Sequence, residues 1–256
     1  MHVGPERGAH EGSRLLWERA SAGVGPSAYL PIPEGMKDRA LRDWLVFQRK
    51  KHRPSLLVTH CDDAVGPAAW AAGSARVLCH RYTSKALQRK TVKGASRRVT
   101  FIVHSLEAEE AVTAVSAVAK VVDPLPLELE PSAAPETYAV GTVRAADAEK
   151  IRGHFLIHGV EIPVISGDEL SVLRGASVVV DLAPSPEPNQ VLLEAQRWGR
   201  LVAVPEGTPH LSAYGEEALV FSPRTLYSIL LSPPEFPEPR RFRGLQQLRQ
   251  IYLGAS

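Results

Sequence analysis

Three predicted strands in the first half of the chain end in histidine. The segments THCDD, CHRYTSK and VHSLEAEE place His60, His80 and His104 directly after apolar runs. Imidazole titrates near neutral pH, so a histidine at a strand end can act as an acid, a base or a hydrogen-bond donor to phosphate. Each histidine taken alone also fits a hydrogen-bonded structural residue.

Carboxylates lie close to one of these histidines, which raises the question of a metal. Asp62 and Asp63 follow His60, and imidazoles with carboxylates are common metal ligands. The histidines are far apart in the sequence, however, and the tight spacing of a metal motif is absent. We therefore predict no metal site.

Two cations in the second half could bind a diphosphate. Arg144 follows a predicted strand that ends at Val143, and Lys150 lies on the next predicted helix. Positive side chains at such a position can neutralise phosphate oxygens. For Lys150 a solvated helix face is the alternative.

Glu194 falls within the apolar pattern of another predicted helix. Its neighbours Val191, Leu192 and Ala195 face the sheet, so the carboxylate needs a polar partner near the core. A pair of ribose hydroxyls would supply one, and so would a neighbouring arginine.

Glycines and basic residues supply two weaker signals. Gly4, Gly8 and Gly12 precede a predicted helix whose N–H groups could face an anion, but their spacing matches no dinucleotide or Walker loop and no strand of useful length precedes them. Segment 81–98 carries only positive charges and can concentrate an anionic ligand, acceptor or membrane surface, or be a solvated face. Its cations are Arg81, Lys85, Arg89, Lys90, Lys93, Arg97 and Arg98.

Composition places these residues in a water-soluble globular protein. The 256 residues are 44% hydrophobic and 23% charged, and the net charge of +2 argues against a nucleic-acid partner. No run is long and apolar enough for a membrane span and no signal peptide is visible, so we expect a cytoplasmic protein. Cys61 and Cys79 end apolar runs and fit buried thiols.

Strand-length and helix-length segments alternate through the first half. Runs such as SLLVTH and VTFIVH are apolar on both faces, which is typical of parallel strands covered by helices on each side. Predicted strands are 27–32, 55–60, 76–80, 99–104 and 120–123. Predicted helices are 12–22, 37–51, 64–72, 84–93 and 106–118.

A proline-rich stretch, DPLPLELEPSAAPET, interrupts this alternation and predicts a semi-rigid linker. After it, strands 138–143, 161–165, 177–183, 201–205 and 218–221 alternate with helices 145–158, 168–174, 189–198 and 223–231, and a final helix follows. We predict two Rossmann-like, doubly wound parallel-sheet domains: 1–125, linker 126–136, and 137–256 with the C-terminal helix. One continuous sheet is the alternative.

The segment PSPEPNQVLLEAQRWGRLVAVPEG resembles a motif of GT-B fold nucleotide-sugar glycosyltransferases, in the retaining, family 4-like group. That motif has Pro-Ser, two glutamates separated by seven residues, then Ala and a Gly-x-Pro-Val-Val-Ala run. Pro186 stands where the first glutamate is expected, and Glu187 comes one position later. The matching residues are Pro184, Ser185, Leu193, Glu194, Ala195, Gly199, Val202 and Ala203.

The resemblance implies a glycosyltransferase that takes a nucleotide-diphosphate sugar as donor and needs no cofactor. Arg144 and Lys150 would neutralise the leaving diphosphate, and His60 or His80 would contact the sugar or acceptor. Nucleotide-sugar contacts would come from Glu187, Glu194 (on the ribose), Gly12 and Gly141. The acceptor, a glycan, lipid or protein, would bind the basic segment of the first half at Arg81, Lys85, Arg89 and Lys90, with peripheral contact to the inner face of the membrane as an option.

Two other interpretations stay open at this point. A catalytically degenerate GT-B scaffold that binds or assembles is favoured by Pro186 and by the short chain. Another nucleotide-binding α/β protein, such as an epimerase, is disfavoured because no dinucleotide glycine fingerprint follows any strand.

Overall fold

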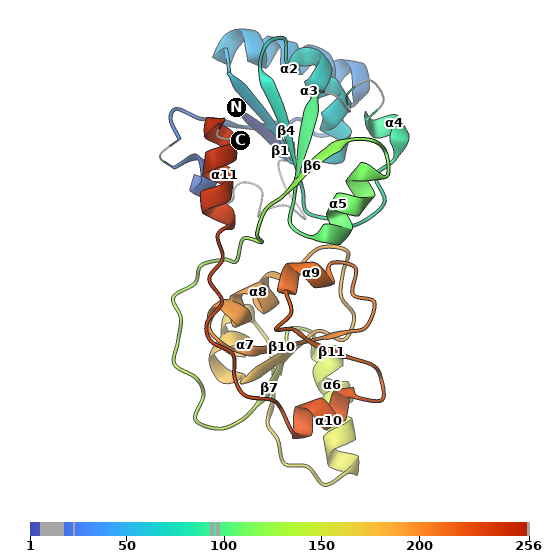
Figure 1. Cartoon of the computed structure of the whole chain (residues 1–256), viewed down its shortest axis with the longest axis vertical. Helices are drawn as coiled ribbons and strands as arrows, with labels where there is room; N and C mark the ends of the chain where they lie inside the picture. The colour runs from blue at the N-terminus through green and yellow to red at the C-terminus, as the bar shows by residue number, and fades with distance from the viewer. Residues whose placement is uncertain (6–17, 23, 93–94, 96–97, 255–256) are drawn as a thin grey trace. The chain divides into compact units, whose positions relative to one another are not determined.

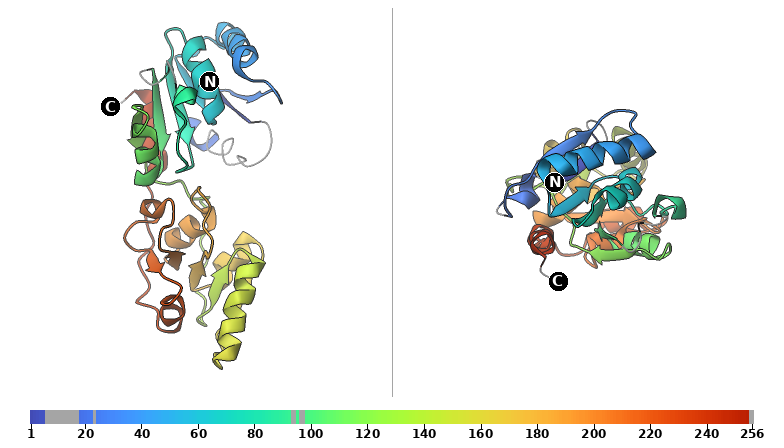
Figure 2. Two further views of the ribbon diagram at one scale, coloured as in Figure 1. Left: turned by 90° about the vertical axis from the view of Figure 1, so that its right-hand side faces the viewer. Right: turned by 90° about the horizontal axis from the view of Figure 1, so that it is seen from above.

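The computed structural model spans residues 1–256, and its described part leaves out residues 6–17, 23, 93–94, 96–97 and 255–256 (Figure 1). The chain divides into two compact units. Unit 1 comprises Met1–Asp123 and Arg243–Ser256, and unit 2 comprises Pro124–Phe242. Each unit is a sheet with helices packed on it, which confirms the predicted α/β class (Figures 1 and 2).

Unit 1 contains a six-stranded sheet of order β2-β1-β3-β4-β5-β6, in which all neighbouring strands are parallel. The strands are β1 (His2–Pro5), β2 (Tyr29–Ile32), β3 (Leu56–Thr59), β4 (Arg76–Arg81), β5 (Val99–Val103) and β6 (Val118–Val121). Its helices are α2 (Asp38–His52), the 3-10 helix η1 (Asp62–Ala64), α3 (Val65–Ala71), α4 (Arg89–Val92), α5 (Leu106–Thr113) and α11 (Gly244–Leu253).

Both faces of this sheet are buried. Leu57, Cys79 and Phe101 belong to one core cluster, together with residues of α2 and α3. Side chains alternate between the faces of a strand, so Val58 and Ile102 point to the opposite face, and they are buried too. The apolar runs therefore form a sheet covered on both sides, as the sequence predicts.

Unit 2 contains a five-stranded parallel sheet of order β11-β10-β9-β7-β8. The strands are β7 (Val140–Thr142), β8 (Val164–Ser166), β9 (Val178–Val180), β10 (Leu201–Pro205) and β11 (Leu219–Phe221). The helices are α6 (Ala145–Ile157), α7 (Glu169–Gly175), α8 (Gln190–Arg197), α9 (Leu211–Tyr214) and α10 (Leu226–Leu231).

The strand order of unit 2 reverses direction once. The chain runs from β7 outward to β8, then returns to the other side of β7 and adds β9, β10 and β11 in turn. The connections on the two sides of β7 leave the sheet in opposite directions, and this opens a crevice at the carboxyl ends of β7 and β9. Ligands of open α/β sheets bind at such a switch point.

The structure corrects the prediction at three places. The short strand β1, His2–Pro5, contains Gly4 and lies where no strand was expected. The proline-rich segment lacks regular structure but packs on unit 2, because Arg200 Nη2 donates to the carbonyls of Ser132 and Ala133. The final helix, α11, packs with unit 1 and not with the second half that precedes it.

Candidate functional site

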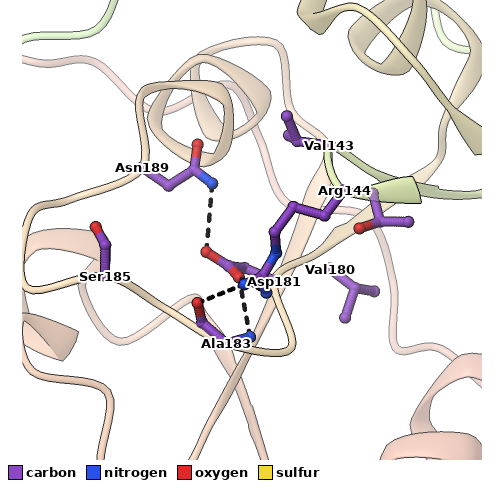
Figure 3. A pocket seen from close by; sticks show the side chains of 8 residues that line it. Val143, Arg144, Val180, Asp181, Ala183, Ser185 and Asn189 are labelled. Atoms are coloured by element: carbon purple, nitrogen blue, oxygen red, sulfur yellow. Dashed lines mark hydrogen bonds and ion pairs between the residues drawn. The ribbon is translucent and has the colours of Figure 1, made fainter. Parts of the chain in front are cut away.

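A cavity of about 200 Å³ lies at the switch point of unit 2 (Figure 3). Its walls come from the ends of β7 and β9 and from the segment that leads from β9 to α8. The lining residues are Thr142, Val143, Arg144, Val180, Asp181, Ala183, Ser185 and Asn189. Three of the eight, Val143, Val180 and Ala183, are apolar, and the other five carry polar side chains.

Arg144 provides a positive charge in this cavity. Its Nη2 lies 2.6 Å from Asp181 Oδ1 and 2.5 Å from Asp147 Oδ2, and its Nη1 donates to the Ala183 carbonyl at 2.8 Å. The side chain keeps 42% of its surface exposed. Its position follows from sequence, because Arg144 is the N-cap residue of α6, two positions after β7 ends.

Asp181 connects Arg144 to the opposite wall. It follows β9 directly, it is buried, and it accepts hydrogen bonds from Ala183 N (3.1 Å) and Asn189 Nδ2 (3.3 Å). Asn189 in turn caps α8, since its Oδ1 accepts from Val191 N at 2.9 Å. Figure 3 shows these side chains converging on Asp181. The network fixes the positions of Arg144 and of the start of α8.

Two features of the cavity suit an anion. The N-cap residues of α6 and α8, Arg144 and Asn189, both line it, so the positive ends of both helix dipoles lie beside it. Thr142 also lines it, and within the described part of the chain its buried Oγ1 has no hydrogen-bond partner. A bound oxygen ligand would satisfy that hydroxyl.

Lys150 does not line this cavity. It lies on α6, where its Nζ is 4.0 Å from Asp147 Oδ1, and 67% of its side chain is exposed. It contributes positive charge at a distance, and of the two predicted cations only Arg144 lies in the cavity wall.

Glu194 has a structural role in unit 2, which contradicts its prediction as a ribose ligand. Its side chain is fully buried on α8, and Oε1 accepts hydrogen bonds from Trp198 Nε1 (2.8 Å) and Arg197 Nε (2.8 Å). Oε2 accepts from Glu128 N at 3.0 Å. Both carboxylate oxygens are therefore bonded to protein, and they hold the proline-rich segment against α8.

The predicted donor-site glycines differ in outcome. Gly141 lies within β7, where a Cβ would come 2.5 Å from Ala176 Cβ and 2.9 Å from Val172 Cγ1. This glycine lets α7 approach the sheet, which is a packing role and not a ligand contact. Gly12 lies outside the described residues. Glu187 is partly buried, two residues after Ser185 in the loop that forms one cavity wall, and its donor contact stays a prediction.

The histidines of unit 1 form a stack that we call the histidine ladder: His2, His60, His80 and His104. Ring centroids are 5.4 Å apart for His2 and His60, 5.2 Å for His60 and His80, and 6.3 Å for His80 and His104. His60 directly follows β3, and His80 lies within β4. These two strands are neighbours in which Thr59 pairs with Cys79, so the next residues, His60 and His80, lie side by side. The rings share the sheet face opposite Leu57 and Cys79.

Hydrogen bonds tie the histidine ladder to other elements of unit 1. His2 Nδ1 lies 3.1 Å from His60 Nε2, and His80 Nε2 lies 2.7 Å from the Tyr252 hydroxyl of α11. Burial lowers the pKa of His2 to about 2 and lowers the pKa of His80 and His104, because the charged imidazolium would lose its hydration. These three rings are neutral at pH 7.

His60 and His80 are each 1% exposed, so neither reaches a substrate in this conformation. The prediction that they are catalytic is therefore corrected, since their rings pack within the ladder and under α11. The sequence placed them at strand ends, as the structure does, but it could not reveal the helix that covers them.

The basic segment keeps only part of its predicted surface. Arg81 is buried, and it bonds to Asp62 Oδ2 (3.3 Å), to the Thr83 carbonyl (2.6 Å) and to the Lys85 carbonyl. It orders the loop after β4 and is not part of an anion-binding surface. Lys85, Arg89 and Lys90 are exposed, while Lys93 and Arg97 lie outside the described residues.

Asp181, Thr142 and Asn189 were not predicted as site residues. For Asp181 a signal was available, because a carboxylate follows the apolar run VVV at a strand end, as Arg144 follows another. Among the described residues there is no cluster of three or more His, Cys, Asp or Glu side chains that could hold a metal ion. The same residues contain no helix long and apolar enough to cross a membrane.

No protein-family model and no curated protein sequence matches this chain. Solved structures do. HepE of Anabaena in complex with UDP and glucose aligns with a TM-score of 0.60 at 14% identity, over 99% of this chain and 94% of that one. MurG of Acinetobacter baumannii gives 0.65 at 13% identity, over 99% of both chains, and a glycosyltransferase from Rickettsia africae gives 0.64 at 9%, over 99% and 92%. The two units thus have the GT-B fold of glycosyltransferases.

Proposed function

We propose that unit 2 binds a nucleotide-diphosphate sugar and that the protein transfers the sugar to an acceptor, with retention of configuration. The observation that carries the proposal is the cavity in which Arg144 meets the N-termini of two helices at the switch point of a parallel sheet. Support also comes from the motif resemblance around Glu194 and from HepE, a protein of the same fold that holds UDP and glucose.

Arg144 is the proposed catalytic residue. As the bond between sugar and diphosphate breaks, negative charge grows on the leaving phosphate oxygens. A guanidinium already fixed beside those oxygens stabilises that charge without reorganising. The N-termini of α6 and α8 also stabilise this negative charge, and Lys150 adds positive charge from α6. This chemistry places no metal in the step.

The acceptor is proposed to bind unit 1. Lys85, Arg89 and Lys90 are exposed there and suit an anionic glycan, lipid or protein, including one presented at the inner face of a membrane in the cytoplasm. The predicted role of His60 and His80 on the acceptor side is not part of this proposal.

A degenerate scaffold that binds without turnover is the second candidate. It is favoured by Pro186 at the position of the first motif glutamate and by the two carboxylates that already pair with Arg144. The two candidates differ in one measurable respect. A degenerate scaffold would bind the nucleotide but would neither transfer the sugar nor hydrolyse the donor.

A thermal-shift panel with UDP, GDP, ADP, CMP and their sugars, with Mg²⁺ present, tests the donor site. A ligand at about 100 times its Kd stabilises the native state by about 2.7 kcal/mol, which gives a clear rise in melting temperature. We expect one nucleotide class to raise it. Arg144→Ala should remove that shift.

Arg152→Ala is the matched control. Arg152 lies on the same helix, outside the cavity, and its Nη2 also donates to a backbone carbonyl, that of Val164. The shift should survive this substitution. A shift that survives Arg144→Ala would refute the assigned site, and no shift with any nucleotide at millimolar concentration would refute the donor.

A further inference from the structure

The charges around the switch-point cavity balance. Arg144 and Lys150 supply two cations, and Asp147 and Asp181 supply two carboxylates that pair with them. These four charges cancel among the residues that the structure describes, so they do not by themselves draw in a diphosphate. The helix dipoles and the geometry of the donors are the features of this group that favour an anion.

The donors of Arg144 are also largely committed. A guanidinium has five N–H groups. In this structure Nη2 faces both carboxylates, and one hydrogen of Nη1 points to the Ala183 carbonyl. The N–H groups of Arg144 that remain for a phosphate in the cavity are Nε–H and the second hydrogen of Nη1. The hydrogens of Nη2 become available only if a carboxylate moves away from them.

Asp181 is the carboxylate in the cavity wall. Asp147 pairs with Arg144 from the first turn of α6 and is not part of the lining, whereas Asp181 lines the cavity and is 7% exposed. A diphosphate bound to Arg144 would therefore lie close to the Asp181 charge and be repelled by it. The same carboxylate also anchors Ala183 and Asn189 by accepting from them.

We propose that Asp181 is a specificity-determining residue that competes with the donor diphosphate for Arg144. This inference rests on the proposed function for the identity of the ligand. In this structure Asp181 pairs with the guanidinium. A ligand must offer enough further contacts, through its nucleoside or sugar, to offset the repulsion, so a bare diphosphate binds poorly and a complete nucleotide sugar is selected.

The test is Asp181→Asn, with Kd measured by calorimetry for inorganic pyrophosphate and for UDP, GDP and ADP. Asparagine keeps the size of the side chain and an oxygen that accepts from Ala183 N, and it removes the charge. We expect pyrophosphate affinity to rise on the order of tenfold, the size expected for one unit charge near a part-exposed phosphate. Affinity for the nucleoside diphosphate that binds should rise less, because its nucleoside supplies further contacts.

Glu161→Gln is the control for overall charge. Glu161 is exposed, lies in the same unit and precedes β8, so it lies at the amino ends of the strands, whereas the cavity lies at the carboxyl ends of β7 and β9. It should leave both affinities unchanged. Circular dichroism checks that Asp181→Asn folds. If it does not, Asp147→Asn replaces it, since Asp147 pairs with the same Nη2 and its removal should also raise pyrophosphate affinity.

The outcomes separate the two proposals. Equal or weaker pyrophosphate binding by Asp181→Asn overturns the competition and makes Asp181 a positioning residue for Arg144. If wild type binds no nucleotide while Asp181→Asn binds pyrophosphate, the competition stands and the donor proposal fails. If neither protein binds any probe, both proposals fail.

Discussion

Arg144 and Glu194 were assigned to one donor site from the sequence, and their surroundings differ. Arg144 follows its strand after two residues and reaches the cavity with part of its surface exposed. Glu194 is enclosed by Trp198, Arg197 and the backbone of Glu128. Of these two residues only Arg144 lines the switch-point cavity, and Glu194 is fully buried.

Glu194→Ala should destabilise the protein without changing its affinity for nucleotides. The substitution leaves the Arg197 guanidinium and the Trp198 N–H without their acceptor and releases Glu128 N, and loss of one partner of a buried pair costs about 3 kcal/mol. Urea unfolding measures the loss. The folded variant should bind ligand with the wild-type Kd.

Glu187→Ala is the matched substitution, because Glu187 lies in the same motif but is only partly buried. It should change the free energy of unfolding by less than about 0.5 kcal/mol. A Glu194→Ala protein of normal stability that has lost nucleotide binding would restore the ribose-ligand role.

The sequence placed Arg144 at the carboxyl end of β7 because the apolar run that predicts this strand ends directly before it. It did not reveal one partner of Glu194, the backbone N–H of Glu128, which lies 66 residues away in a segment without regular structure. The sequence allowed two partners for this carboxylate, a ribose or an arginine. The structure has the arginine, on the same helix at Arg197.

At the scale of elements, β7 and α7 make close contact at one glycine. A Cβ on Gly141 would overlap Ala176 and Val172, which lie at the end of α7 and within it. β7 is also the strand from which the switch-point crevice opens. The position of α7 against this strand therefore determines the local geometry of the sheet beside the cavity.

Gly141→Ala should lower the free energy of unfolding by about 1–3 kcal/mol, the usual cost of overpacking a core. Gly153 provides the contrast. It is an exposed glycine inside α6 with open space around its Cα, so Gly153→Ala should stabilise the protein by about 0.5–1 kcal/mol. Denaturant unfolding of both variants checks the prediction. It is wrong if both substitutions lower the free energy of unfolding or if both raise it.

Long apolar runs and helix-length patterns were sufficient to predict most of the elements of the two units, but not β1. β3, β5, α2 and α6 lie where the sequence places them, within a few residues. β1 was missed because HVGP is four residues long and contains glycine and proline, which are poor strand formers. Its strand geometry comes from pairing with β2 and β3, which a local pattern does not contain.

At the scale of the whole molecule, the chain leaves unit 1 at Asp123 and returns to it at Arg243. The returning segment brings α11, whose Tyr252 bonds to His80 and whose backbone carbonyls at Ile251 and Tyr252 accept from Arg76. The histidine ladder is therefore buried between segments from both ends of the chain.

The protein should lose stability on mild acidification. Burial lowers the pKa of His2, His80 and His104 in the folded state, whereas the same groups in the unfolded chain take up protons near pH 6.5. Their contribution to stability is therefore fully present above about pH 6.5 and is lost as the pH falls below it. His2, whose pKa is lowered to about 2, gives a loss of about 1.4 kcal/mol by pH 5.5, and His80 and His104 add to the loss in the same direction. Burial also lowers the pKa of the Met1 ammonium to about 6, which adds to the loss.

Urea unfolding at about pH 7.5 and about pH 5.5 measures this loss. His104→Gln should reduce the number of protons taken up on unfolding in this pH range, because the pKa of His104 is lowered by burial in the folded state. Stability that is constant or rises on acidification would contradict the lowered pKa values of His2, His80 and His104.

The return of the chain to unit 1 also bears on how the protein is made. A ribosome synthesises from the amino end, so it completes all of Pro124–Phe242 before it makes α11. Unit 2 is continuous and can fold as soon as it emerges. The nascent unit 1 meanwhile lacks Tyr252, and its sheet exposes the histidine face to solvent and chaperones. The unit whose translation starts first is therefore the one whose fold is completed last.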